Sequence, residues 1–202
     1  MHNFLKRSLL FVIATCVVIA SQAAPETTAA ADALNNPVVI LHTSKGPITL
    51  ELYPEQAPIT VANFLAYAES GFYDDTIFHR VIKRFMIQAG GFNKKMVEKN
   101  TKAPIINESG NGLHNDRWTI AMARTDDPDS ASAQFFINTK MNSALDAGQG
   151  KSGYAVFGKV TEGQYVVEAI EKVPTMSLGQ HGNVPVEPVT IESVEIKPST
   201  TP

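Results

Sequence analysis

The sequence predicts a mainly β fold, a closed antiparallel barrel of eight strands capped by two α-helices. Eight short segments have the apolar, β-branched composition of strands, and clusters of Gly, Pro and Asn separate them. Apolar residues recur at helical spacing in only two segments. A closed antiparallel barrel pairs many short strands without leaving exposed edges, so it is the architecture that fits these observations.

The first expected elements are a hairpin and a helix. Residues 38–41 and 48–52 are predicted strands, and residues 45–47 (Lys-Gly-Pro) form the turn between them. Pro58 begins a helix at a position where its missing N–H costs nothing, and Gly71 ends that helix. The apolar face of the helix comprises Val61, Phe64, Leu65 and Ala68.

The rest of the chain is expected to be strands with one further helix. Residues 165–172 are the second helix, which stops before Pro174. Residues 189–196 alternate as the last strand, with a bulge expected near Ser193 where the alternation slips. The other predicted strands are residues 77–82, 85–88, 118–123, 135–138 and 155–160.

The N-terminus has the pattern of a signal peptide. Lys6 and Arg7 precede an apolar run at residues 9–20, and small residues follow up to a predicted cleavage after Ala23, or alternatively after Ala24. The run is short for a membrane span, so a retained anchor is the competing interpretation. We therefore expect export and no stable membrane association after cleavage.

The single cysteine, Cys16, lies inside this apolar run. Lipid attachment there is a second competing interpretation, but Thr15 stands where lipoproteins carry a small residue, and the apolar run continues beyond Cys16. Cleavage would leave a chain without cysteine, which suits an oxidising compartment.

The remaining chain reads as one domain. Residues 24–36, rich in Ala and Thr, are an expected flexible leader, residues 37–198 the folded domain and residues 199–202 a tail. After cleavage, 15 basic and 20 acidic residues would remain, a net charge of −5. This acidity argues against a nucleic-acid partner, which would favour a basic face.

Two motifs that suggest other functions fail on inspection. Residues 150–152 (Gly-Lys-Ser) resemble the end of a phosphate-binding loop, but Leu145 replaces the required glycine and a strand follows. Pro128 interrupts a short acidic run at residues 126–129, which lacks the closing glutamate of a calcium loop. The histidines show no metal-ligand spacing, so we expect no metal and no cofactor.

Three sequence blocks predict a pocket with one apolar side and one hydrogen-bonding side. Residues 78–82 (Phe-His-Arg-Val-Ile) place the cation Arg80 among strand formers, and residues 85–91 add the amide Gln88. Residues 134–138 (Gln-Phe-Phe-Ile-Asn) supply a second amide and two aromatic rings. Such a pocket suits proline, whose ring is apolar and whose preceding peptide bond is polar.

These blocks, in this order, resemble the cyclophilin family of peptidyl-prolyl cis-trans isomerases. The likeness spans roughly residues 37–197 and includes residues 122–124, 130–138 and 154–160. The N-terminal segment and the details of residues 121–124 look most like the periplasmic cyclophilins of Gram-negative bacteria.

The resemblance implies a monomeric periplasmic isomerase without a cofactor. Its partners would be proline-containing, unfolded or flexible polypeptides, whose folding it would assist. The alternative is a binding module or holdase that recognises proline segments with little turnover, and the intact Arg80 favours the isomerase.

The resemblance also assigns roles to individual residues. Arg80 matches the catalytic arginine, Gln88 the amide that holds the substrate backbone, and Gln134 a glutamine near the floor of the groove. Ala123 and Arg124 match the segment that pairs with the peptide before the proline. Tyr154 stands at a position that is commonly histidine, where its hydroxyl would add a hydrogen bond. The walls of the proline pocket correspond to Phe85, Met86, Phe136 and Leu145.

The chain departs from the family pattern at three further places. Lys83 and Arg84 replace a common Pro-Gly pair, and Ala89 replaces a glycine after the active-site glutamine. Ala144 stands where many eukaryotic members have a tryptophan, whose indole N–H donates to the inhibitor cyclosporin in sensitive members. These differences bear on the turn before Phe85 and on inhibitor binding.

Overall fold

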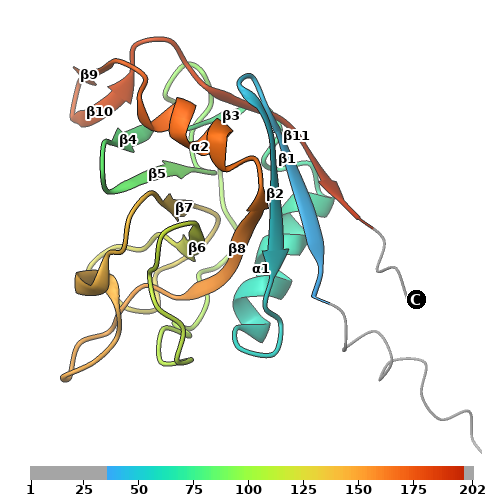
Figure 1. Cartoon of the computed structure of the whole chain (residues 1–202), viewed down its shortest axis with the longest axis vertical. Coiled ribbons are helices and arrows are strands. Elements are labelled where there is room, and N and C mark those ends of the chain that lie inside the picture. The colour runs from blue at the N-terminus through green and yellow to red at the C-terminus, as the bar shows by residue number, and fades with distance from the viewer. Residues whose placement is uncertain (1–35, 198–202) are drawn as a thin grey trace, which may run out of the picture.

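The structure is a computed structural model that describes residues 36–197 (Figure 1). The predicted signal peptide, all but Asn36 of the predicted leader, residue 198 and the predicted tail lie outside the described residues. Within the described part, no helix is both long and apolar enough to cross a bilayer.

Nine strands form one sheet in the order β3-β11-β1-β2-β8-β6-β7-β5-β4, and two more form a separate hairpin, β9 and β10. Every pairing is antiparallel. The strands are β1 (Val38–Thr43), β2 (Gly46–Leu52), β3 (Thr76–Ile77), β4 (Arg80–Ile82), β5 (Met86–Ala89), β6 (Thr119–Met122), β7 (Phe135–Asn138), β8 (Val156–Glu162), β9 (Thr175–Leu178), β10 (His181–Pro185) and β11 (Thr190–Ile196).

The large sheet is curled and open and has nine strands. The expected mainly β fold is therefore confirmed, but the expected closure into an eight-stranded barrel is not. The predicted strand at residues 77–82 is interrupted at Phe78 and His79. On one side of the break β3 pairs with β11, and on the other β4 pairs with β5. Because β3 and β4 do not pair with each other, the two edges of the sheet meet at a chain corner and leave the barrel unclosed.

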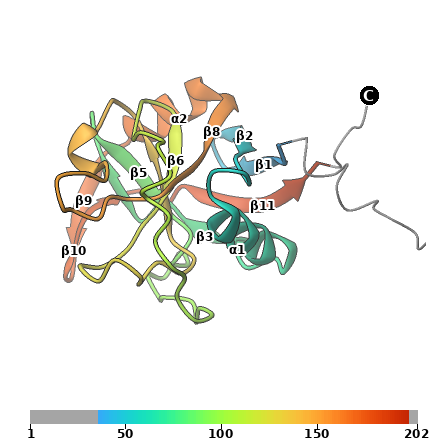
Figure 2. The same cartoon turned by 90° about the horizontal axis from the view of Figure 1, so that it is seen from below.

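Two α-helices lie at opposite ends of the curled sheet, as Figures 1 and 2 show, and both bury side chains in the same core, which confirms their prediction. Helix α1 (Pro58–Glu69) has proline in its first turn and buries Val61 and Phe64. Helix α2 (Gln164–Glu171) buries Val166, Val167 and Ile170 and packs against β2, β4 and β5. A short 3₁₀-helix, η2, follows β7 at Ser143–Leu145.

The last strand, β11, lies in the sheet between β1 and β3. Its pairing with β1 slips by one residue, since Ser193 lies opposite His42 and Ile191 lies opposite Thr43. The bulge predicted near Ser193 is therefore confirmed. The hairpin of β9 and β10 was not predicted, because its residues are mostly exposed and show no apolar alternation.

The two faces of the strands β5, β6 and β7 support different clusters. One face carries Ile87, Ile120, Phe135 and Ile137 into the main core. The other face carries a smaller buried group of Met86, Ala121 and Phe136, joined by Val156 of β8. Since successive side chains on a strand point to opposite faces, this alternation separates the core from the candidate site.

Candidate active site

Strand register places the central site residues in one row. Arg80 on β4 lies opposite Gln88 on β5, and Gln88 lies opposite Phe136 on β7. The row continues through Ala121 on β6 to Val156 on β8. Directly paired residues share a face of the sheet, so residues far apart in sequence converge on one surface.

A cavity of about 200 Å³ opens on this surface. Nine of the ten site residues expected from the sequence line it, and the tenth, Gln134, lies against Gln88 instead. The lining residues are Arg80, Phe85, Met86, Gln88, Ala123, Arg124, Phe136, Leu145 and Tyr154.

The apolar side of this cavity is well packed. Met86 and Phe136 are buried at its base, while Phe85 and Leu145 are half-buried at its walls. The Tyr154 ring meets the Phe136 ring nearly edge-on, with 5.6 Å between ring centroids and 78° between planes. This arrangement presents an apolar surface to a ring-shaped ligand while keeping the aromatic side chains in a favourable geometry.

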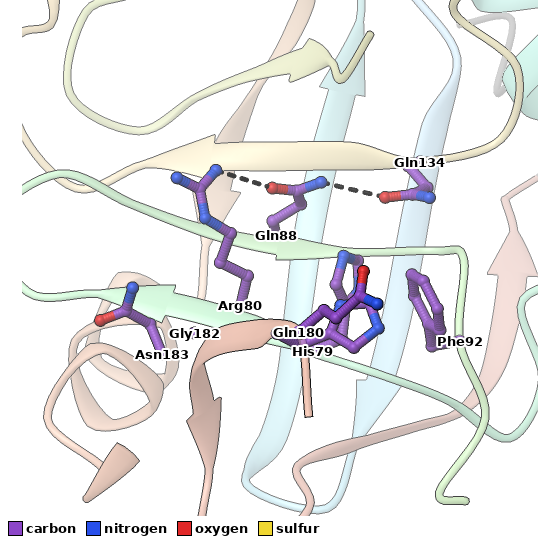
Figure 3. Close-up of a pocket in the computed structure, with 9 residues that line it drawn as sticks. His79, Arg80, Gln88, Phe92, Gln134, Gln180, Gly182 and Asn183 are labelled. Carbon is purple, nitrogen blue, oxygen red and sulfur yellow. Dashed lines mark hydrogen bonds between the residues drawn. The ribbon is translucent and has the colours of Figure 1, made fainter. Parts of the chain in front are cut away.

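The polar side of the cavity is built around Arg80, whose hydrogen bond to Gln88 is drawn in Figure 3. One guanidinium nitrogen of Arg80 donates to Gln88 Oε1 at 3.3 Å, and Gln88 Nε2 donates to Gln134 Oε1 at 3.0 Å. Among the described residues Arg80 forms no ion pair. The guanidinium keeps further N–H donors that this bond does not use.

Arg124 is held by its own loops. Its guanidinium donates to the carbonyl oxygens of Ser152, Gly153 and Thr125 at 2.7, 3.1 and 2.8 Å. It also lies over the Tyr154 ring, 4.6 Å from the centroid. The charge of Arg124 therefore organises the cavity wall.

The turn before Phe85 accommodates Lys83 and Arg84. Arg84 adopts a positive φ of 57°, where the common family pair has glycine available. The Glu171 carboxylate of α2 accepts the backbone N–H of Arg84 at 2.6 Å, and Phe85 N–H donates to the carbonyl of Ile82 at 3.1 Å. Helix α2 thus holds the turn in place of the Pro-Gly chemistry.

Three asparagines behind the cavity form a network that sequence reasoning missed. Asn142 Nδ2 donates to the carbonyl of Phe85 at 2.8 Å and to Asn138 Oδ1 at 2.7 Å. Asn138 donates to Asn115, which in turn donates to the Leu145 carbonyl at 3.2 Å. The network joins the two apolar walls. Its sequence signal was an asparagine ending an apolar strand, where a buried amide must find partners.

His79 is buried beside Arg80, at the corner between β3 and β4. Its ring packs on Phe92, with 4.7 Å between centroids. Burial lowers the pKa of His79 from 6.5 to about 4, since the charged imidazolium is poorly solvated there. The imidazole is therefore neutral at pH 7, which leaves Arg80 as the cation at this corner.

A second cavity of about 500 Å³ adjoins Arg80 on its other side (Figure 3). The tip of the β9–β10 hairpin forms part of its wall through residues 180–183. Sequence reasoning missed this contribution because it did not predict the hairpin. Among the described residues, no group of three or more His, Cys, Asp or Glu comes together as a metal site requires.

Comparison with known proteins identifies relatives over nearly the whole described chain. The family described as "Cyclophilin type peptidyl-prolyl cis-trans isomerase/CLD" matches residues 38–196. A peptidyl-prolyl cis-trans isomerase of Acinetobacter baylyi is 54% identical over 171 residues, covering 85% of this chain and 91% of the relative. Peptidyl-prolyl cis-trans isomerase B of Escherichia coli is 51% identical over 163 residues, covering 79% and 99%.

Solved structures agree with this relationship. The crystal structure of a cyclophilin-type peptidyl-prolyl cis-trans isomerase of Cryptosporidium parvum superposes with a TM-score of 0.70 at 28% identity, covering 83% of this chain and 99% of that one. The matched family, the identities and the shared fold lead to one conclusion: the chain belongs to the cyclophilin-type peptidyl-prolyl cis-trans isomerase family.

Proposed function

We propose that this cyclophilin-type isomerase binds the proline of exported, unfolded or flexible polypeptides in the 200 Å³ cavity and uses Arg80 to accelerate rotation of the preceding peptide bond. The observation that carries the proposal is the position of Arg80. It borders an apolar cavity, is held by an amide, and has no anionic partner among the described residues.

The reaction is a rotation, so no covalent intermediate is required. Resonance gives the peptide bond a rotational barrier of about 18–20 kcal/mol. When an X-Pro bond twists, the prolyl nitrogen regains a lone pair that can accept a hydrogen bond. A donor that meets this lone pair binds the twisted state more strongly than the planar one, which is the condition for catalysis.

Each side of the cavity has its own part in the proposal. Met86, Phe136 and the other apolar walls hold the proline ring, so that the bond twists against a fixed group. Arg80 donates to the prolyl nitrogen with a guanidinium N–H that is not used in its hydrogen bond to Gln88. Because the donor is already in place, little reorganisation is needed as the bond twists.

The segment around Ala123 and the amide of Gln88 hold the peptide before the proline. Ala123 lies at the rim of the cavity, next to Gln88 and Arg124. Since the Arg124 guanidinium is occupied by carbonyl oxygens, we assign its contribution to the wall and to the main chain. Tyr154, under the same guanidinium, adds a hydroxyl at the rim.

Substitution of Arg80 tests this mechanism. Arg80→Ala should lower kcat/KM for cis/trans isomerisation of a short X-Pro peptide by about 10² or more, the scale of removing one preorganised donor. Arg117→Ala is the matched control, because that arginine stacks on Trp118 and pairs with Glu168, outside the cavity. A folded Arg80→Ala protein with wild-type turnover would contradict the mechanism.

We further propose that the protein is exported to the periplasm as a monomer without stable membrane association. The support for export is the charged, apolar and small-residue pattern of the first 23 residues, which lie outside the described structure. Mass spectrometry of the exported protein should give a chain beginning at Ala24, or at Pro25 by the alternative cleavage. A mass that retains the first 23 residues, or a lipid on Cys16, would contradict this.

A further inference from the structure

The hydrogen bonds from Arg80 continue past Gln134 and end on a carboxylate. Gln134 Nε2 donates to Glu98 Oε1 at 3.2 Å, so three consecutive bonds connect Arg80, Gln88, Gln134 and Glu98. In every bond the donor lies on the Arg80 side and the acceptor on the Glu98 side. We call this series the amide chain. Figure 3 shows its first two bonds.

The ends of the amide chain have opposite hydrogen-bonding character. A guanidinium can only donate, and an ionised carboxylate can only accept. The two glutamines between them each carry one donor end and one acceptor end, so each could be turned around. With a donor at Arg80 and an acceptor at Glu98, only one orientation of both amides satisfies all three bonds.

The position of Glu98 is built into the fold although its side chain is exposed. The loop that carries it is closed by Asn93, whose Oδ1 accepts the backbone N–H groups of Lys95 and Val97 at 2.9 and 3.1 Å. Glu98 itself pairs with Phe92 in an isolated antiparallel bridge. Its backbone is therefore fixed beside the segment that follows β5.

Gly91 provides the space for Gln134 to reach Glu98. A Cβ atom at position 91 would lie 2.6 Å from Gln134 Cδ, closer than such atoms can approach. The side chain of Gln134 thus lies directly across the Gly91 backbone. Without a side chain at position 91, this space is left for the Gln134 amide.

We propose that Glu98 is a positioning residue for the isomerase. By accepting from Gln134 it orients Gln134, which orients Gln88, which presents Oε1 to Arg80. Glu98 thereby keeps the guanidinium turned so that its remaining donors face the proline cavity. The proposal rests on the role proposed above for Arg80.

Three substitutions at Glu98 separate its accepting function from its charge. Glu98→Gln keeps an acceptor and should stay within about twofold of wild-type kcat/KM. Glu98→Ala removes the acceptor and should lower kcat/KM about threefold. Glu98→Lys places a donor opposite Gln134, which favours the reversed amide, and should lower kcat/KM about tenfold. A loss in Glu98→Gln as large as in Glu98→Lys would overturn the proposal.

A positioning role also predicts where the loss occurs. Since Arg80 acts in the twisted state, NMR exchange measurements should show the loss in turnover and not in peptide affinity. Glu98 also borders a neighbouring cavity of about 200 Å³, from which it could contact the peptide directly. A direct contact would give losses that differ between peptides varied before the proline, whereas the amide chain gives the same factor for all of them.

Double substitutions test whether Glu98 acts through Gln134. In a Gln134→Ala background, Glu98→Ala and Glu98→Lys should have no further effect, because the connection to Arg80 is already cut. A full additional loss in that background would refute the positioning role. Glu69→Lys, the same charge change at the exposed end of α1, should leave turnover unchanged. Arg80→Ala in the same assay separates a failure of the Arg80 mechanism from a failure at Glu98 alone.

Discussion

Acidification should destabilise the protein through His79. The folded-state pKa of His79 is lowered by burial to about 4, and an unfolded chain has an ordinary histidine pKa of about 6.5. Below pH 6.5 the unfolded chain binds a proton at this residue and the folded protein does not. The free energy of unfolding therefore falls as the pH drops from about 6.5 to 4, and this contribution is fully present only above that window.

The size of the effect follows from the two pKa values. Each unit of pKa difference corresponds to about 1.4 kcal/mol, so the loss between pH 7 and pH 5 is about 2 kcal/mol. With a urea m-value of about 2 kcal/mol/M, the unfolding midpoint should fall by about 1 M over that interval. This interval lies above the ordinary range of carboxylate titration, so few carboxylates contribute to the change.

The assay is urea unfolding at pH 7 and pH 5, for wild type and His79→Asn. The variant cannot titrate at this position, so its midpoint should change much less between the two pH values, whatever its overall stability. Comparing the difference between pH values cancels the other titrating groups, which the two proteins share. Equal losses in both proteins would show that His79 is not the source and that its burial is tolerated with a proton.

Two further predictions concern the site. Gly91→Ala should leave the free energy of unfolding within about 1 kcal/mol of wild type, since the flexible Gln134 side chain can move aside. By displacing Gln134 it should lower kcat/KM about three- to tenfold. An active protein with Gln134 unmoved in an NMR or crystal structure would contradict this. Cyclosporin should inhibit only weakly, because Ala144 beside the cavity wall offers neither an indole donor nor a ring. The missing contacts correspond to about 2–4 kcal/mol of binding free energy, and Ala144→Trp should recover part of it. Nanomolar inhibition of wild type in a peptide-assay titration would refute the prediction.

Most of the secondary structure could be predicted because it depends on local pattern. Helices α1 and α2 carry apolar residues at helical spacing, β2 and β11 largely alternate, and β1 begins with four apolar residues in a row. The errors lie where tertiary contacts decide. The strand expected at residues 77–82 breaks because His79 turns inward against Phe92, a residue from another part of the chain. The open sheet follows from that break, which no local pattern reveals.

The site divides in the same way. The residues that line the 200 Å³ cavity, the proposed proline site, were found because they occur in compact, ordered blocks that resemble a known family. The residues that support them were missed because their importance depends on pairing across the fold. Glu98 occurs in a polar loop without a motif, and Asn142 looks like an ordinary turn residue. In the sequence, Gly91 is only the second residue of a Gly-Gly pair, and its importance is evident only from the position of the Gln134 side chain.

The place of β11 has a consequence for when this protein can fold. Strand β11, from the last residues of the domain, lies between β1 and β3, so the first strand completes its pairing only with the end of the chain. Val39 pairs with Ile196, so the contact between β1 and β11 joins residues that are very far apart in sequence. Contacts of large sequence separation form slowly. During synthesis β1 has one open edge until residue 196 has emerged. The chain is thus kept from finishing its sheet early, which suits the export proposed above, because a chain that crosses a membrane unfolded must fold afterwards.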